Sequence, residues 1–201
     1  DLFYVHEFLA GFRTAAGQLS GMADGIADAA TSAVDQFNAD LGALEQINVG
    51  LRKARPGSTG EATLLDERDR LIDQLSAQGG VCASFDGRGA ATLRATASGD
   101  VLVGGGTVTP IAATTAADGR VSFSIAGGAP FTTATGSLAG LAEASNHVAD
   151  QRAALDTMAG DFAGQLNAAH QAGTDANGNP GAALFAGTGG AATLTVAPLT
   201  A

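Results

Sequence analysis

Residues 2–54 carry apolar side chains at steps of three and four, the spacing that places them on one face of a helix. The seam of the stronger part consists of Leu19, Met22, Ile26, Ala30, Ala33, Phe37, Leu41, Leu44, Ile47 and Leu51. Acidic residues such as Asp28, Asp40 and Glu45 fall largely off this seam, so we expect them in solvent. The denser apolar start predicts a separate helix before Gly17. The region is therefore predicted to be helical in two or more pieces, with a coiled-coil-like seam.

A second helix is predicted at residues 63–78, after the break that proline and glycine impose at 56–60. Thr63 is its expected N-cap, with Asp66 three residues later in an approximate capping box. Gly79 is expected to end it. Because two helices joined by a few residues normally fold back on each other, we expect an αα-hairpin.

From residue 81 to about residue 135 the period changes to an alternation of apolar and polar positions, most clearly at 121–125. We predict four to six short antiparallel strands there. Ser137 then opens a third helical pattern as a plausible N-cap, and the pattern continues to about residue 172. A helix of this length suits a rod better than a globular domain.

These patterns predict an α+β fold, an elongated bundle of long antiparallel helices (a rod) with an inserted small antiparallel β domain. We expect residues 1–80 to form the first part of the rod and residues 81–135 to form the β domain. Residues 136–174 are expected to be the long return helix of the rod. Residues 175–201 are expected to hold a turn, a docking segment and a terminal strand.

Composition limits the possible partners. The 201 residues include 20 acidic and 10 basic ones, a formal net charge of −10, which argues against binding to nucleic acid or to an anionic membrane surface. No run of 18 apolar residues is present, so no membrane span is expected, and no signal peptide is visible. The single cysteine, Cys82, excludes an internal disulfide, and its apolar neighbours predict a buried structural thiol.

Candidate chemistry is sparse. His6, His147 and His170 each lack a second ligand at convincing spacing, so we expect structural roles for them. Residues 175–181 resemble a calcium loop superficially, but Pro180 occupies the position that requires glycine, which favours a plain turn.

Two further patterns also have plain structural interpretations. The three glycines at 104–106 have no helix pattern after them, so we expect a turn rather than a dinucleotide-binding loop. The acidic and basic residues that alternate at 66–70 are expected on a solvated helix face. The sequence therefore predicts no catalytic, cofactor-binding or metal-binding residue and no cofactor, and we expect no enzyme.

Several blocks of the chain, in this order, resemble a known family. Residues 36–48 resemble a "VNxLLxQIAxLN" helix, and residues 64–76 resemble an "LLDxRD…LDxLS" segment. The later blocks are a "VxVGGG" piece at 101–106, a "GxLxGL" helix start at 136–141, and an "LAxxxNxxHxxGxDxNGN" pattern at 162–179 followed by Leu184 and Phe185. These blocks are similar to the family of flagellar hook-associated protein one, which joins the flagellar hook to the filament.

This resemblance implies a structural protein of the bacterial flagellum that is needed for filament assembly. The implied partners are other copies of itself in a ring, the hook protein, a second hook–filament junction protein and an export chaperone. The implied location is extracellular, in the flagellum, after export through the flagellar type III secretion system. The family's terminal polymerisation segments are not seen here, so we expect a central fragment that does not polymerise by itself.

Other function classes stay open at this point. A generic extracellular helical adhesin or coiled-coil interaction module would have a similar composition. A carbohydrate-binding β unit would need an aromatic-lined groove, yet residues 81–135 offer only three phenylalanines. Under the junction hypothesis, single polar substitutions should be nearly silent, whereas a charge in the apolar seam should unfold the rod.

Overall fold

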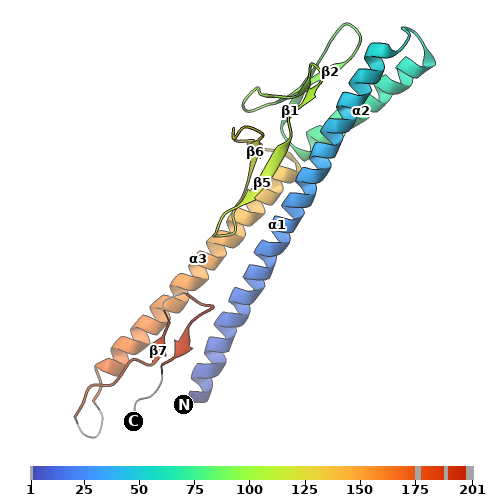
Figure 1. The fold of residues 1–201 in the computed structure, drawn as a ribbon. Helices are drawn as coiled ribbons and strands as arrows, with labels where there is room; N and C mark the ends of the chain where they lie inside the picture. Colours follow the sequence, from blue (N-terminus) through green and yellow to red (C-terminus); the bar gives the residue numbers. More distant parts are fainter. Residues whose placement is uncertain (1, 175–177, 188–189, 198–201) are drawn as a thin grey trace. The chain divides into compact units, whose positions relative to one another are not determined.

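The helices account for most of the structure. The computed structural model describes residues 2–174, 178–187 and 190–197, with side chains from residue 6 onward. The helices are α1 (Leu2–Lys53), α2 (Thr59–Gln78) and α3 (Gly136–Gln171) (Figure 1). The strands are β1 (Val81–Phe85), β2 (Ala91–Ala95), β3 (Val101–Gly104), β4 (Thr107–Val108), β5 (Ile111–Thr115), β6 (Val121–Ile125), β7 (Phe185–Ala186) and β8 (Thr195–Val196). The predicted α+β class, long helices with inserted antiparallel strands, is confirmed.

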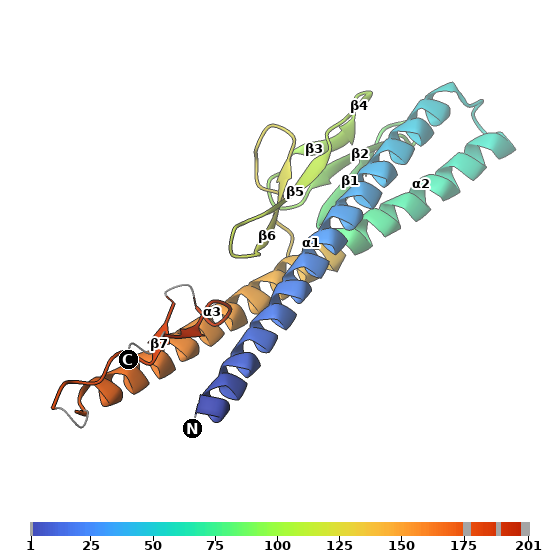
Figure 2. The ribbon, with the colours of Figure 1, turned by 60° about the horizontal axis from the view of Figure 1, so that its bottom comes forward.

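The strands between α2 and α3 form two separate antiparallel sheets. One sheet has the order β1-β2-β3-β4, with Val81 opposite Ala95 and Phe85 opposite Ala91 in its first pair (Figure 2). The other pairs β5 with β6, with Ile111 opposite Ile125. Every pairing joins neighbours in sequence, which is the pattern of successive hairpins. The short strands β7 and β8 pair with each other after α3.

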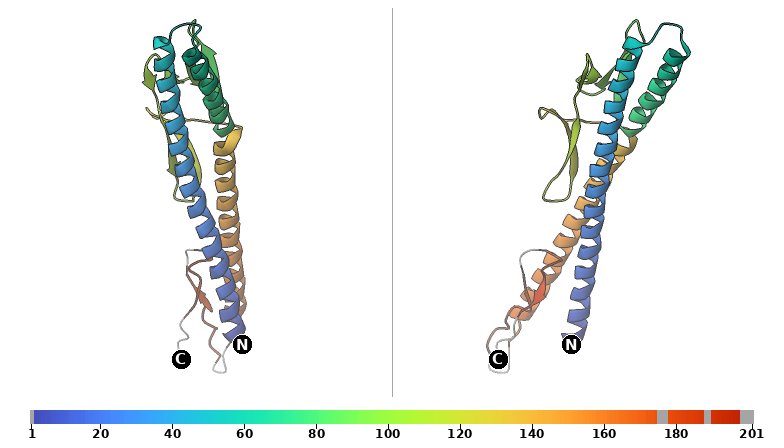
Figure 3. Two further views of the ribbon diagram at one scale, coloured as in Figure 1. Left: turned by 90° about the vertical axis from the view of Figure 1, so that its right-hand side faces the viewer. Right: turned by 45° about the vertical axis from the view of Figure 1, so that its right-hand side comes forward.

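The chain divides into two compact units. The first unit comprises Asp1–Asp24 and His147–Ala201, and the second unit comprises Gly25–Asn146. In the first unit, the start of α1 packs antiparallel to the end of α3, and the buried cluster is Leu9, Phe12, Ala159, Ala163, Phe185, Ala191 and Leu194. In the second unit, the rest of α1 and α2 form the predicted αα-hairpin, and Figure 3 shows the two helices side by side.

The core of the second unit is shared between helices and strands. Phe37 of α1 lies with its ring centroid 5.6 Å from that of Phe131, which follows β6. Leu75 of α2, Leu93 of β2 and Leu138 of α3 are fully buried in the same cluster. The two sheets are therefore held by burial against the helices. The rod and β-domain boundaries predicted from the sequence stay a prediction.

Two predicted details of the helices are wrong. α1 runs without interruption through Gly17, where no separate helix ends. A Cβ built at Gly17 would have no neighbour within 4 Å, so no close packing requires glycine at this position. Glycine lowers the stability of a helix interior, but it does not end the helix here. α2 begins at Thr59, and its N-cap is Ser58 rather than Thr63, because the Ser58 Oγ accepts the Glu61 N–H at 3.2 Å.

Several predicted burial states are also wrong. Met22 and Met158 are 54% and 60% exposed, although both lie at seam spacing. Cys82 is exposed because strand alternation turns it outward, opposite the exposed Arg94, on the outer face of β1. Conversely, Asp40 and Glu45 are buried, although we expected them in solvent. Their partners in the second unit explain this burial.

Candidate functional site

The residues with potential chemistry do not converge. His147 and His170 lie at opposite ends of the first unit's part of α3, roughly 35 Å apart at the helical rise. His6 is exposed on α1. Residues 175–177 of the calcium-like turn lie outside the described residues. Within the described part of the chain, no group of three or more His, Cys, Asp or Glu side chains could hold a metal ion.

The glycines at 104–106 and the charged run of α2 have structural roles. Gly105 and Gly106 have φ values of 61° and 88° and form the turn between β3 and β4. In α2, the Arg68 side chain is only 12% exposed, contrary to the expected solvated face. Its guanidinium donates to the Gly89 carbonyl oxygen and lies 4.3 Å from the centroid of the Phe85 ring. Arg68 therefore links α2 to the β1–β2 hairpin through a hydrogen bond and a cation–π contact.

Asn48 is an almost fully buried polar anchor of the second unit. It lies on α1 with 1% of its surface exposed. Its Oδ1 accepts the Ala91 N–H at 2.7 Å, and its Nδ2 donates to the Ala91 carbonyl oxygen at 2.8 Å. The side-chain amide thus pairs with the first residue of β2 as a neighbouring strand would. The Nδ2 atom also lies 3.3 Å from Oε2 of Glu45, whose Oε1 accepts from Arg52 at 2.7 Å.

Asn38 repeats this arrangement on the same helix. Its Oδ1 accepts the Ile111 N–H at 2.9 Å, and its Nδ2 donates to the Ile111 carbonyl oxygen at 2.8 Å. It therefore pairs with the first residue of β5, on the other sheet. On α3, the Ser145 Oγ accepts the Val121 N–H of β6 at 2.9 Å. Each sheet is thus hydrogen-bonded to a helix through a short polar side chain.

The buried carboxylate of Asp40 connects the two helices of the hairpin. It accepts hydrogen bonds from Nε2 of Gln78 on α2 at 2.7 Å and from Nε2 of Gln36 on α1 at 2.9 Å. Buried polar groups need hydrogen-bond partners in place of water, and these two donors supply them. Its burial is therefore explained by its partners.

In the first unit, residues 182–187 and 190–197 are hydrogen-bonded to the helices; we call these two described stretches the strap. Asn167 accepts the N–H groups of Leu184 and Phe185 at 2.7 and 2.9 Å and donates to the Phe185 carbonyl oxygen at 3.1 Å. Nδ1 of His170 lies 2.6 Å from the carbonyl oxygen of Ala182. The asparagine and histidine of the 162–179 block thus hold the chain after α3.

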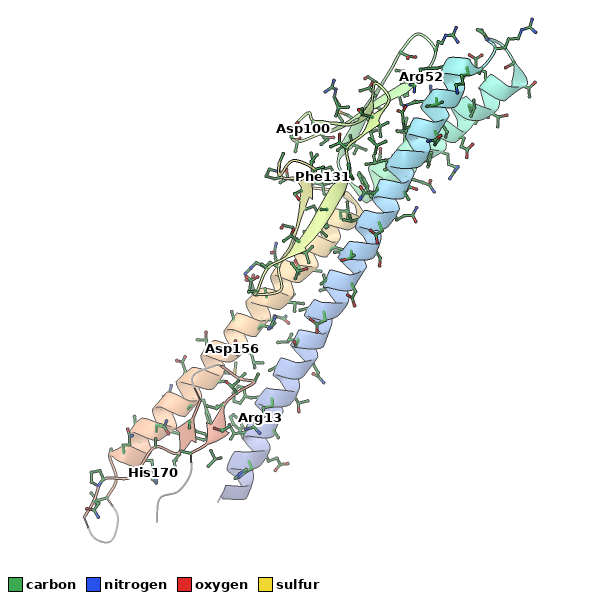
Figure 4. The ribbon with its side chains drawn as sticks, viewed as in Figure 1. Arg13, Arg52, Asp100, Phe131, Asp156 and His170 are labelled. Atoms are coloured by element: carbon green, nitrogen blue, oxygen red, sulfur yellow. The ribbon has the colours of Figure 1, made fainter. Side chains whose placement is uncertain are left out.

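Two further side chains hold the far end of the strap. Asp156 of α3 accepts the Ala191 N–H at 2.8 Å, and Arg13 of α1 donates to the Leu194 carbonyl oxygen at 2.8 Å. Figure 4 shows Arg13 and Asp156 reaching toward the strap from their two helices. The strap therefore binds the start of α1 to the end of α3.

Two of the hollows in the first unit lie beside the strap and between its two helices. A cavity of about 690 Å³ lies between α3 and the strap, and its lining consists of small residues together with Asp156, Asn167, Phe185 and Leu194. An apolar groove between α1 and α3 is lined by Phe8, Phe12, Leu155 and other residues. Neither hollow brings together a nucleophile and a base of the kind that acid–base chemistry requires.

One carboxyl group has a displaced pKa. The backbone N–H of Arg120, and then the side chain of the same arginine, donate to Asp118 and hold its pKa below the usual value of 3.8. This carboxylate closes the exposed turn between β5 and β6. No helix among the described residues is long and apolar enough to cross a membrane.

Sequence reasoning missed the anchoring residues. Asn38, Asn48 and Asn167 all lie inside the blocks that carry the family resemblance, but that resemblance assigned them no role. The available signal was asparagine in a helix interior, where it is a poor helix former and therefore needs another reason to be present.

A family model and a solved structure both relate this chain to FlgK. Residues 4–185 match the family model of the flagellar hook-associated protein FlgK helical domain. Among solved structures, the chain is similar to the flagellar hook junction protein FlgK from Burkholderia pseudomallei, with 26% sequence identity and a TM-score of 0.73. The match covers 89% of this chain and 34% of that protein, so the chain spans about a third of its length. No curated protein matches.

The family resemblance predicted from the blocks at 36–48, 64–76 and 162–179 is confirmed, because all three lie within the matched range. The matched range also contains α1 from its first turn, α2, both sheets of the second unit and α3. The chain therefore belongs to the family of the flagellar hook-associated protein FlgK helical domain.

Proposed function

We propose that the protein containing this chain forms the junction between the flagellar hook and the filament and is needed for filament assembly. By family, the chain is a flagellar hook-associated structural protein. The observation that carries the finer proposal is the similarity to a solved FlgK that is a hook junction protein, at 26% identity over 89% of this chain. The use of the buried polar side chains as anchors supports a structural role rather than a catalytic one.

The proposed partners follow from the junction role. The whole protein would form a ring with other copies of itself, between the hook protein and a second junction protein. An export chaperone would keep it ready for the flagellar type III secretion system. Residues 1–80 and 136–174 would form the rod of this subunit, and residues 81–135 would form its β domain.

The test is the phenotype of cells that lack the parent gene. We expect electron microscopy to show bare hooks, and we expect flagellin to accumulate in the culture medium. A plasmid copy of the parent gene should restore filaments, which controls for effects on neighbouring genes. Normal filaments in the deletion strain would contradict the junction role.

The alternative role, an extracellular adhesin, makes a different prediction for the same strain. Loss of an adhesin would leave filaments intact and reduce attachment of cells to surfaces. Counting attached cells in a strain paralysed by another mutation separates loss of adhesion from loss of motility.

A further inference from the structure

Basic side chains gather at one end of the α1–α2 hairpin in the second unit. Lys53 ends α1, Arg55 lies in the following turn, and Arg88 lies in the β1–β2 turn; we call these three residues the basic tip. All three are exposed. Nη1 of Arg88 donates to the Arg52 carbonyl oxygen at 2.9 Å, which places the β1–β2 turn against the end of α1. Figure 4 labels Arg52 at this end of the helix.

No carboxylate in the described part of the chain forms an ion pair with the basic tip. Arg52 is paired with Glu45, but none of the three tip residues forms an ion pair among the described residues. Two carboxylates lie nearby in sequence, and both accept backbone N–H groups. Asp86 accepts the N–H groups of its own turn, and the Glu61 carboxylate accepts the Gly57 N–H at 2.6 Å.

The same helix carries the opposite charge farther from the tip. Asp28 and Asp35 are exposed and seven positions apart, so they share one face of α1; we call them the acidic stripe. From residue 14 to residue 51 the sequence contains no lysine or arginine. Neither aspartate of the stripe forms an ion pair in the described part of the chain.

The tip and the stripe cannot neutralise each other within one molecule. Asp35 and Lys53 are 18 positions apart on a continuous helix, a separation of roughly 27 Å at the helical rise. This exceeds the screening length of about 8 Å at physiological ionic strength. Two different, complementary patches on one molecule are what a head-to-tail contact between copies requires, and such contacts close into rings when the rotation allows.

We propose that the basic tip of one copy contacts the acidic stripe of a second copy. The proposal rests on the proposed function, in which copies of the whole protein form a ring. The occupant is a second copy because every copy carries both patches, so the exposed basic tip of one copy is complementary in charge to the exposed acidic stripe of another, although the whole chains carry a formal net charge of −10. The contact is electrostatic, so salt weakens it.

Zero-length crosslinking tests this contact directly, because Lys53 is the only lysine of the chain. A carbodiimide joins an amine to a carboxylate only when the two are in contact. Isotope-labelled and unlabelled chains are mixed at high concentration, and mass spectrometry then identifies crosslinks between copies. We expect Lys53 to be joined to Asp28 or Asp35 of the other copy. Raising the salt from about 20 mM to about 500 mM should reduce this product several-fold.

Several variants sharpen the result. K53R keeps the charge and removes the amine, so the crosslink should disappear, while the weak association that sedimentation detects at high protein concentration and low salt should persist. The triple variant K53E/R55E/R88E should lose association with the original chain and regain it with a D28K/D35K partner. The double variant R55E/R88E should also lose association, and R70E/R94E, which reverses the same number of exposed arginines elsewhere, is its matched control and should behave like the original chain.

The proposal is overturned if Lys53 gives no crosslink between copies, or if its crosslinks go only to carboxylates outside the stripe. It is also overturned if R55E/R88E, which has the same net charge as R70E/R94E, associates as well as R70E/R94E does. These outcomes concern the purified chain, whereas the proposed junction role is tested by the phenotype of a deletion strain. Failure of one is therefore distinguishable from failure of the other.

Discussion

The substitution Asn48→Ala should destabilise the second unit strongly, although it removes only a polar side chain. Its amide is the partner of both the N–H and the carbonyl oxygen of Ala91, which is 3% exposed. Alanine would leave both backbone groups buried without partners. A buried unsatisfied group costs about 1–3 kcal/mol, so the two together should lower the free energy of unfolding by about 2–6 kcal/mol.

The assay is urea denaturation followed by far-ultraviolet circular dichroism, together with hydrogen exchange of the peptide that contains Ala91. Asn146→Ala is the matched control, because Asn146 is a helical asparagine whose hydrogen bond from Nη1 of Arg120 is exposed to water, so its loss should change stability by less than about 0.5 kcal/mol. We expect Asn48→Ala to shift the urea midpoint and to speed the exchange of β2. If Asn48→Ala is as stable as Asn146→Ala, the anchoring role of the buried amide is refuted.

Three other perturbations test other parts of the structure. Asn167→Ala removes three hydrogen bonds to the strap, so limited proteolysis should cut the strap several-fold faster while α3 stays intact. Gly136→Ala should lower the melting temperature of the chain, because the residue has φ +88° and its Cβ would lie 2.6 Å from a backbone oxygen of α2. The carboxyl carbon of Asp118 should titrate below 3.8 by nuclear magnetic resonance. Because the folded pKa is lowered, its small contribution to stability should be present above the unfolded pKa and be lost as pH falls through the folded pKa, and Arg120→Ala should raise the pKa.

The helices were largely predictable because their signal is local. The seam at Phe37, Leu41 and Leu44 is buried as its spacing predicts. The β alternation and the approximate start of α3 were also predictable from period and turn chemistry, but Ser137 is not the N-cap that we expected, because α3 already begins at Gly136. The N-cap Ser58 could have been found, because Ser58 followed by Glu61 is the capping-box pattern in its usual form.

The polar anchors were not predictable, because their partners are distant in sequence. Asn48 lies 43 positions from Ala91, and Asn38 lies 73 positions from Ile111. A helical pattern shows which face is apolar, but it does not show that an asparagine faces the open edge of a strand. The expectation that polar substitutions are nearly silent therefore does not extend to these residues.

The periodicity of the sequence also did not predict which single apolar residues would be exposed to solvent. Met22 and Met158 fit the helical spacing of the apolar residues, yet both are exposed. When the apolar face of a helix is wider than the surface that covers it, the residues at the edge of that face stay in solvent. For Cys82, apolar neighbours in sequence were a poor guide to burial. Successive side chains of a strand point to opposite faces, so Val81 and Ala83 point inward and Cys82 points to solvent.

The most direct test of the junction role is the position of the protein in the intact flagellum. Antibodies raised against this chain and coupled to gold can be imaged by electron microscopy on isolated hook–filament complexes, with the deletion strain complemented by the parent gene as the source. We predict a single band of gold at the boundary between hook and filament. Gold spread along the filament or confined to the cell surface would contradict the account.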